Sequence, residues 1–298
     1  LTSVEISREV KTIGDYAFYE CSNLKTVTLC SGITKIESNA FSNCRMIESL
    51  VIPDSVTAIG DNAFYGCTYL TERFISDSLI SIGNNAFYGC GVLRIDTFPI
   101  SLTTIGDYAF YKCPGPTNLK IPQGVTGIGD YAFSSCSGLT ILVLPEGVTS
   151  IGYGAFAACG ELTNLVIPNT VTSLGEKAFE DCDKLVYEVV NGVTYMGPCA
   201  IAFDNSAALV EIRQGTTLIA TGAFTGCTKL RIVTLPDSIT GIGDMAFEGC
   251  TGLSRITIPS SVTSIGYRAF AGCTNLTGIT IPNSVICIGE SAFAGCTG

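Results

Sequence analysis

The sequence predicts a solenoid of the α/β class, with about thirteen coils of 23 residues that each hold short parallel strands and a single helical turn. Two observations predict it. The dipeptide Ala-Phe occurs twelve times at a step of 23 residues, with one irregular interval, and a cysteine follows three residues after each of these phenylalanines. A fixed period of this length is typical of repeat proteins whose units stack on one another. The phenylalanines are Phe18, Phe41, Phe64, Phe87, Phe110, Phe133, Phe156, Phe179, Phe224, Phe247, Phe270 and Phe293.

Each unit contains two extended segments and one turn. Its pattern is L-x-x-I-x-I-P-x-x-V-x-x-I-G-x-x-A-F-x-x-C-x-x, which residues 276–298 show almost without exception. The I-x-I segment alternates as a strand does, and the proline ends that strand because it has no N–H to donate. V-x-x-I-G predicts a second short extended segment, closed by a glycine where the backbone turns with positive φ. A-F-x-x-C is too short for an independent helix and predicts one α or 3₁₀ turn.

The repeats divide the chain into three parts: regular repeats over 1–184, an irregular section over 185–222 and a second regular group over 223–298. Phe179 and Phe224 are 45 residues apart, which is one fewer than two units. Within the irregular section, Asn191-Gly192 between two β-rich runs predicts a hairpin with a tight type I′ turn. Phe203 is interpreted as a displaced member of the phenylalanine series.

The cysteines predict a row of buried free thiols. Twelve of the 15 share one repeat position, so they stack about 4.8 Å apart along the array. Parallel side chains in such a row point in the same direction, whereas a disulfide needs two side chains that point toward each other. Cys30, Cys199 and Cys287 lie outside the row. The cysteines therefore say little about the compartment.

The charge balance argues against two kinds of partner. The formal net charge is −10, from 26 acidic and 16 basic residues, and no run of basic residues occurs. Nucleic acids and anionic membrane surfaces both attract clustered Lys and Arg. No apolar stretch approaches the roughly 18 residues that cross a bilayer. We expect no nucleic-acid partner and no direct membrane insertion. Both ends of the sequence coincide with repeat boundaries and lack a polar cap, so we also expect it to be part of a longer protein.

The repeat resembles the leucine-rich repeats of the BspA-like (Treponema pallidum-type) family, through its L-x-x-I-x-I-P and I-G-x-x-A-F-x-x-C signatures, over essentially the whole chain. The resemblance implies a leucine-rich-repeat solenoid. It also implies a location at the cell surface or outside the cell, since the family consists largely of surface or secreted proteins of bacteria and some mucosal protozoa. Its members are linked to adhesion to host matrix proteins or to other cells. The resemblance supplies no catalytic residue and no defined ligand motif.

Most of the residues that carry enzyme chemistry are missing. The chain contains no histidine, which excludes histidine-based triads and histidine-ligated zinc. One acidic position recurs directly after the turn glycine, and we expect its side chains to cap the helical turn; a glycosidase pair or a weak calcium site are the alternatives. These acids are Asp15, Asp61, Asp107, Asp130 and Asp244. We expect no catalytic residue, no cofactor and no metal site.

Tyrosines flank the Ala-Phe dipeptide at two repeat positions, nearly all of them in the first six repeats. They predict either aromatic stacking between coils or an exposed stripe that recognises a partner, because tyrosine is enriched at binding sites. The variable outward positions of the first strand offer a second candidate face, where an apolar patch would indicate an interface. The candidate binding residues are Tyr16, Tyr19, Tyr65, Tyr88, Tyr108, Tyr111 and Tyr131 on the flank, with Val51 and Phe74 on the strand face.

The sequence leaves three hypotheses of function open. The leading hypothesis is a non-enzymatic binding or adhesion scaffold that contacts a protein ligand, a host matrix or cell-surface protein. The first alternative is a structural spacer or stalk that presents another domain. The second is a hydrolase with acidic residues on the irregular section 185–222, which would require two facing carboxyl groups.

Overall fold

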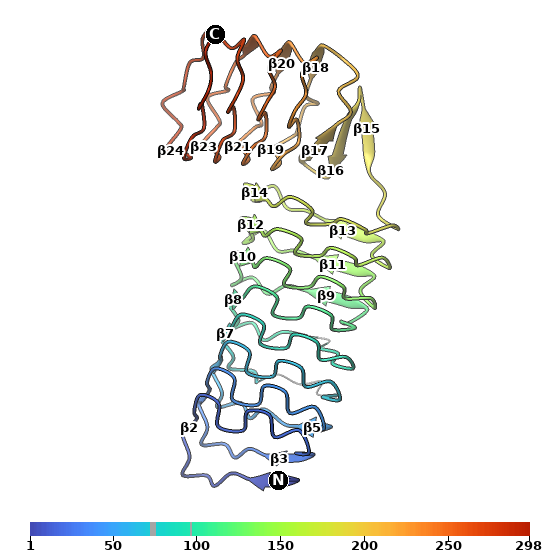
Figure 1. Ribbon diagram of the computed structural model, residues 1–298, viewed down its shortest axis with the longest axis vertical. Coiled ribbons are helices and arrows are strands. Elements are labelled where there is room, and N and C mark those ends of the chain that lie inside the picture. Colours follow the sequence, from blue (N-terminus) through green and yellow to red (C-terminus); the bar gives the residue numbers. More distant parts are fainter. Residues whose placement is uncertain (72–75, 96) are drawn as a thin grey trace. The chain divides into compact units, whose positions relative to one another are not determined.

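The computed structural model describes residues 1–71, 76–95 and 97–298, which form two compact units (Figure 1). Unit 1 comprises Leu1–Val166 and Lys177–Leu185, and unit 2 comprises Ile167–Glu176 and Val186–Gly298. In each unit successive coils stack in register at a step of 23 residues. For example, Ile36 pairs with Ile59, and Ile59 pairs with Ile82. The coils number about 12, close to the thirteen expected.

Unit 1 is built from parallel strands of two or three residues. Among the described residues, first strands form two three-stranded sheets: β1 (Ser3–Glu5), β3 (Thr26–Thr28) and β5 (Ser49–Leu50), then β9 (Asn118–Lys120), β11 (Ile141–Val143) and β13 (Asn164–Val166). The second strand of each coil forms a longer ladder in chain order: β2 (Thr12–Ile13), β4 (Lys35–Ile36), β6 (Ala58–Ile59), β7 (Ser81–Ile82), β8 (Thr104–Ile105), β10 (Gly127–Ile128) and β12 (Ser150–Ile151).

Unit 2 repeats this plan after an antiparallel start. It contains β14 (Ser173–Leu174) and one ladder of β15 (Glu188–Val190), β16 (Val193–Met196), β17 (Cys199–Phe203), β19 (Leu218–Ile219), β21 (Gly241–Ile242), β23 (Ser264–Ile265) and β24 (Cys287–Ile288). Its second sheet consists of β18 (Leu209–Glu211), β20 (Ile232–Thr234) and β22 (Arg255–Ile256).

The expected hairpin is present. β15 pairs with β16 in antiparallel register, with Val190 opposite Val193. Asn191 and Gly192 both have positive φ, at 51° and 80°, as a type I′ turn requires. The ring of Phe203 lies 5.2 Å from that of Phe224, so it does continue the phenylalanine series. The division of the whole chain into three parts remains a prediction.

The prediction of a helical turn, and with it the α/β class, was wrong. No helix occurs among the described residues. The Ala-Phe segment is a series of tight turns, as in the hydrogen bonds from Tyr65 N–H to the Asn62 carbonyl and from Cys67 N–H to the Phe64 carbonyl, both 3.1 Å. In every coil the residue before the alanine and the second residue after the phenylalanine have positive φ. Left-handed residues at these two positions prevent a right-handed helix.

The glycine after the second strand is needed for a reason other than the one expected. The φ angles of Gly60, Gly83 and Gly106 are not positive. A Cβ atom at each of these positions would lie 2.7 Å from a backbone nitrogen of the preceding coil. Real Cβ atoms essentially never approach a neighbouring atom so closely. Glycine therefore permits the close approach of adjacent coils, and the expectation of a left-handed turn was wrong.

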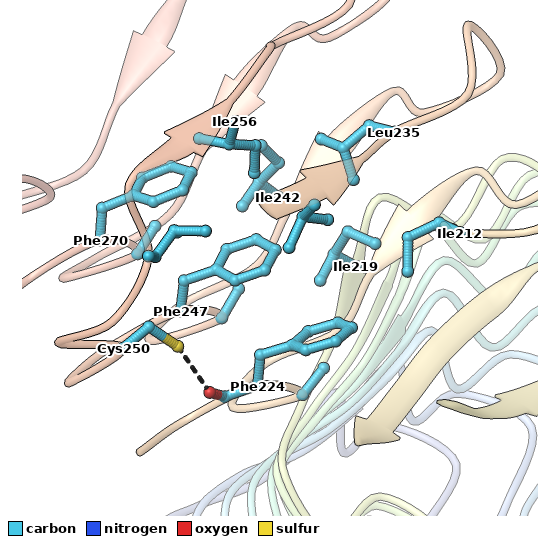
Figure 2. Packing of buried hydrophobic residues seen from close by; sticks show 14 of the residues in the cluster. Ile212, Ile219, Phe224, Leu235, Ile242, Phe247, Cys250, Ile256 and Phe270 are labelled. Carbon is cyan, nitrogen blue, oxygen red and sulfur yellow. Dashed lines mark hydrogen bonds between the residues drawn. The ribbon is translucent and has the colours of Figure 1, made fainter. Parts of the chain in front are cut away.

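The phenylalanines form the centre of the core. Neighbouring rings stack nearly parallel, for example Phe64 and Phe87 with centroids 5.3 Å apart and Phe247 and Phe270 at 5.2 Å. Figure 2 shows three such rings in unit 2 beside the strand residues Ile219 and Ile242. Each ring offset-stacks on the next, an arrangement that favours aromatic pairs, so one core runs through successive coils of each unit.

The thiols are free, as expected. The row of cysteines follows the phenylalanines. Most of its buried thiols donate to a carbonyl of the preceding coil, for example Cys250 Sγ to the Phe224 carbonyl at 2.9 Å (Figure 2), whereas Cys227 Sγ donates to Thr225 of its own coil. Burial raises the pKa of Cys159 and of Cys199 to about 12. The cysteines therefore act as small buried hydrophobic residues with one weak hydrogen bond each.

Candidate functional site

Six tyrosines of unit 1 form one continuous aromatic surface on the turn segments, which we call the tyrosine ribbon. They are Tyr65, Tyr88, Tyr108, Tyr111, Tyr131 and Tyr153, and all are half-buried. Five of them occupy the residue before the alanine or the residue after the phenylalanine, on either side of the buried Ala-Phe pair, and Tyr153 directly follows the turn glycine. The fixed 23-residue step then brings each tyrosine beside the equivalent residue of the next coil.

The ribbon crosses the coils obliquely. Tyr65 stacks on Tyr88 with centroids 4.7 Å apart, and Tyr88 on Tyr111 at 4.8 Å. Tyr111 meets Tyr108 edge to face at 5.7 Å, which moves the ribbon from one repeat position to the other.

From Tyr108 the contact continues to Tyr131 at 4.8 Å, and from there to Tyr153 at 5.3 Å. Tyr153 was not predicted, because it occupies the position that an acidic residue holds in the preceding coil. The sequence could have indicated this tyrosine, because Tyr153 lies in the coil that follows the coil of Tyr131.

Two predicted tyrosines lie apart from the ribbon. Tyr16 and Tyr19 contact each other edge to face at 5.5 Å, and both are exposed. The next coil carries Asn39 and Ser42 at the two repeat positions, so no aromatic side chain connects this pair to Tyr65. The structure therefore separates one exposed pair from a larger half-buried ribbon.

The strand face is a separate surface. Val51 is 66% exposed and follows β5, whereas Phe74 lies outside the described residues. Val143 and Val166 are also exposed on β11 and β13. Nothing among the described residues brings Val51 together with the tyrosine ribbon, and the apolar patch of Val51 with Phe74 remains a prediction.

The acidic position next to the ribbon links coils. The expectation that these side chains cap a helical turn was wrong, since the part of the chain that the structure describes contains no helix. Instead Oδ1 of Asp107 accepts a hydrogen bond from Asp130 N–H at 2.8 Å, and Oδ1 of Asp130 accepts one from Tyr153 N–H at 2.7 Å. Asn84 does the same for Asp107 N–H with its amide oxygen, at 2.8 Å. One oxygen of each carboxylate is thus engaged, and Asp61, Asp107 and Asp130 are exposed.

The partial burial of the ribbon affects the pKa of Tyr88. Burial, followed by the neighbouring phenols, raises the pKa of Tyr88. The buried side-chain oxygens without a hydrogen-bond partner are those of Thr216, Thr217 and Ser284, among the residues that the structure describes. None of the ribbon hydroxyls is among these buried unpaired atoms, and the side chain of Tyr131 hydrogen-bonds to that of Tyr153.

Neither a metal site nor a membrane span is found within the described ranges. No group of three or more His, Cys, Asp or Glu residues there could hold a metal ion. In that part of the chain no helix is long and apolar enough to cross a bilayer.

Comparison with known families and structures identifies the repeats. The model of the BspA type leucine rich repeat region matches residues 1–115, 57–186, 103–209 and 200–298. A leucine rich cell surface protein from Faecalibacterium prausnitzii is 36% identical, over 89% of this chain and 75% of that one, with a TM-score of 0.51. A leucine-rich repeat protein from Bacteroides ovatus is 28% identical, over 99% of this chain and 85% of that one, with a TM-score of 0.57. The search of curated proteins finds no match.

Proposed function

The chain belongs to the BspA-type leucine-rich repeat family, and from this premise we propose that it is a non-enzymatic binding scaffold at the cell surface or outside the cell. Its ligand is a protein of a host matrix or of another cell. Repeat solenoids of this kind present long regular surfaces that suit protein binding. The description of the Faecalibacterium prausnitzii relative as a cell surface protein supports the location.

The tyrosine ribbon carries this proposal. Tyr65, Tyr88 and Tyr111 are already held in place by stacking at 4.7 and 4.8 Å, so they lose little conformational freedom when a partner covers them. Tyr108 and Tyr131 adopt positive φ, at 55° and 52°, a conformation that is uncommon for a bulky residue. Other coils place Asn, Gly, Lys, Met, Arg or Ser there in the same conformation, so the backbone does not require tyrosine at this position.

The acidic residues of the irregular section support a non-enzymatic role. A glycosidase needs one carboxyl group with a raised pKa opposite a second one. Glu188 forms an ion pair with Arg213. Hydrogen bonds from the Ser206 side chain and backbone lower the pKa of Asp204. These two acids lack the environment that a general acid requires.

The test is binding of the purified chain to immobilised matrix glycoproteins and to intact epithelial cells. Replacing Tyr65, Tyr88 and Tyr111 together with alanine removes the central stack and is expected to weaken binding by more than about tenfold. Thermal unfolding of the variant checks that unit 1 remains folded. The matched control replaces Tyr69 and Tyr267, two exposed tyrosines outside the ribbon, and is expected to bind as the parent does. A parent chain that binds none of these probes would favour the spacer, and unchanged binding by the triple variant would refute the ribbon as the contact surface.

A further inference from the structure

The stacking of the ribbon decides which part of each tyrosine a ligand meets. Tyr65, Tyr88 and Tyr111 lie nearly parallel, with interplanar angles of 18° and 28°. Their ring faces cover one another, so a ligand meets the edges of these half-buried rings. A flat ligand cannot lie on these faces. The ribbon instead offers a row of hydroxyl donors and shallow gaps between ring edges, at a step of 4.7 to 4.8 Å.

A negative row runs beside these donors. Asp107 directly precedes Tyr108, and Asp130 directly precedes Tyr131. One carboxylate oxygen of each is held by the next coil, which fixes the position of the other oxygen. Two cations lie near the ribbon: Lys112, whose Nζ lies 5.2 Å from the Tyr111 ring centroid, and Lys177, which acts electrostatically on Tyr131. Acidic side chains thus outnumber basic ones along this flank, and they favour a basic ligand.

The spacing fits one form of polypeptide. Two ring steps along the central stack cover about 9.5 Å. A polyproline II helix repeats after three residues with a rise of about 3.1 Å each, which gives roughly 9.3 Å per turn. Its carbonyl groups make no internal hydrogen bonds and need donors. Surfaces lined with aromatic side chains recognise such segments.

We propose that the tyrosine ribbon and its acidic row bind a proline-rich segment in the polyproline II conformation that carries Lys or Arg. The tyrosine hydroxyls donate to the carbonyls of the segment, its proline rings fill the gaps between the ring edges, and Asp61, Asp107 and Asp130 attract its basic side chains. The proposal rests on the proposed function, since it names the class of partner for the same surface.

The probe is a synthetic peptide of roughly nine residues built from Pro-Pro-Arg triplets, about the length of the ribbon. The control peptide has Gly-Ser in place of each Pro-Pro and the same charge. Titration followed by calorimetry or fluorescence anisotropy is expected to show the proline peptide binding at least about tenfold more tightly, because the flexible control must be ordered on binding. Equal affinity for both peptides would mean attraction by charge alone and would overturn the proposal, as would the absence of binding.

Two sets of substitutions separate the two kinds of contact. Replacing Asp61, Asp107 and Asp130 with asparagine keeps the hydrogen bonds between coils, because Asn84 already makes such a bond with its amide oxygen. This variant is expected to weaken binding of the proline peptide about tenfold and to lose most of its dependence on salt. Replacing Tyr65, Tyr88 and Tyr111 with phenylalanine keeps the stack but removes the donors, and is expected to weaken binding about tenfold or more. If either variant binds the peptide as the parent does, the corresponding contact is refuted.

The outcomes distinguish the two proposals. If the parent chain binds a matrix glycoprotein or epithelial cells through the ribbon but not the proline peptide, the scaffold function stands and the assignment of a proline-rich partner fails. If the parent chain binds the peptide while the tyrosine-to-alanine variant keeps its full binding to the cells and matrix proteins, the assignment of a proline-rich partner stands. The ribbon is then not the surface that contacts the cells and matrix proteins.

Discussion

The repeat position after the second strand is nearly always glycine, because a Cβ atom there would clash with the preceding coil. At Gly106 an added Cβ would lie 2.6 Å from Asn84 Oδ1 and 2.7 Å from Asn84 N. Asn84 lies two residues beyond β7, which pairs with β8, and its Oδ1 accepts a hydrogen bond from Asp107 N–H, so the preceding coil is held in place at this point. Gly14 holds the same repeat position, yet nothing lies within 4 Å of its added Cβ. The requirement for glycine therefore arises from the stacking of coils.

This difference gives a matched pair of substitutions. Gly106→Ala is expected to lower the free energy of unfolding by about 1–3 kcal/mol, because the methyl group overpacks the contact between two coils. Gly14→Ala is expected to leave it unchanged or raise it by up to about 1 kcal/mol, because alanine restricts the unfolded chain. Urea denaturation of the two variants measures both values. A similar loss in both would mean that the backbone conformation, and not the approach of the coils, requires glycine.

Single residues also show what the sequence could reveal about the candidate site. The stacking of Tyr65, Tyr88 and Tyr111 follows from the 23-residue step alone, and it was one of the two readings predicted. The sideways contact from Tyr111 to Tyr108 could not be predicted, since it depends on side-chain directions within the turn. The step from Tyr131 to Tyr153 crosses from one repeat position to another, which a search along one position does not find. The binding role of these residues remains a proposal.

At the level of elements, the predictions succeeded where local and repeat signals agree. The I-x-I strands, the Asn-Gly hairpin and the buried cysteine row all follow from alternation, turn chemistry and period. The helical turn was predicted from segment length alone, although Asn39, Asn62 and Asn85 recur before the alanine, and glycine recurs at Gly66 and Gly89 after the phenylalanine. Asn and Gly are the residues that adopt positive φ most readily, so the sequence did contain the signal for successive turns.

The hairpin of unit 2 allows this turn chemistry to be measured. Asn191 has a φ of 51° in the turn between β15 and β16, where a β-branched side chain is strained. Asn191→Val is expected to lower the free energy of unfolding by about 1–2 kcal/mol. Asn283→Val, an exposed asparagine of the same unit without positive φ, is expected to change it by less than about 0.5 kcal/mol. Chemical denaturation followed by circular dichroism compares them, and an equal effect at both positions would contradict the type I′ assignment.

Across the whole molecule, two features of composition set how stability depends on pH. The chain has no histidine, so it lacks the side chain that normally titrates between about pH 5 and 8. Its interior holds a row of thiols, and burial raises the pKa of Cys136 well above its usual value and that of Cys159 to about 12. In the unfolded chain these thiols lose their protons near the ordinary thiol pKa of 9.0, whereas in the folded chain they keep them.

The sign of the effect follows. Above about pH 9 the unfolded state binds fewer protons than the folded state, so the free energy of unfolding falls as the pH rises. We expect a flat profile from about pH 6 to 8, then a decline toward pH 12 to which each buried thiol contributes up to about 1.4 kcal/mol per pH unit. The measurement is urea denaturation at a series of pH values in a reducing buffer. Replacing Cys136 and Cys159 with alanine should make the decline less steep while leaving the flat region flat. A parent and variant with the same slope above pH 9 would show that the thiols already ionise in the folded chain, which a continuous dry core does not permit.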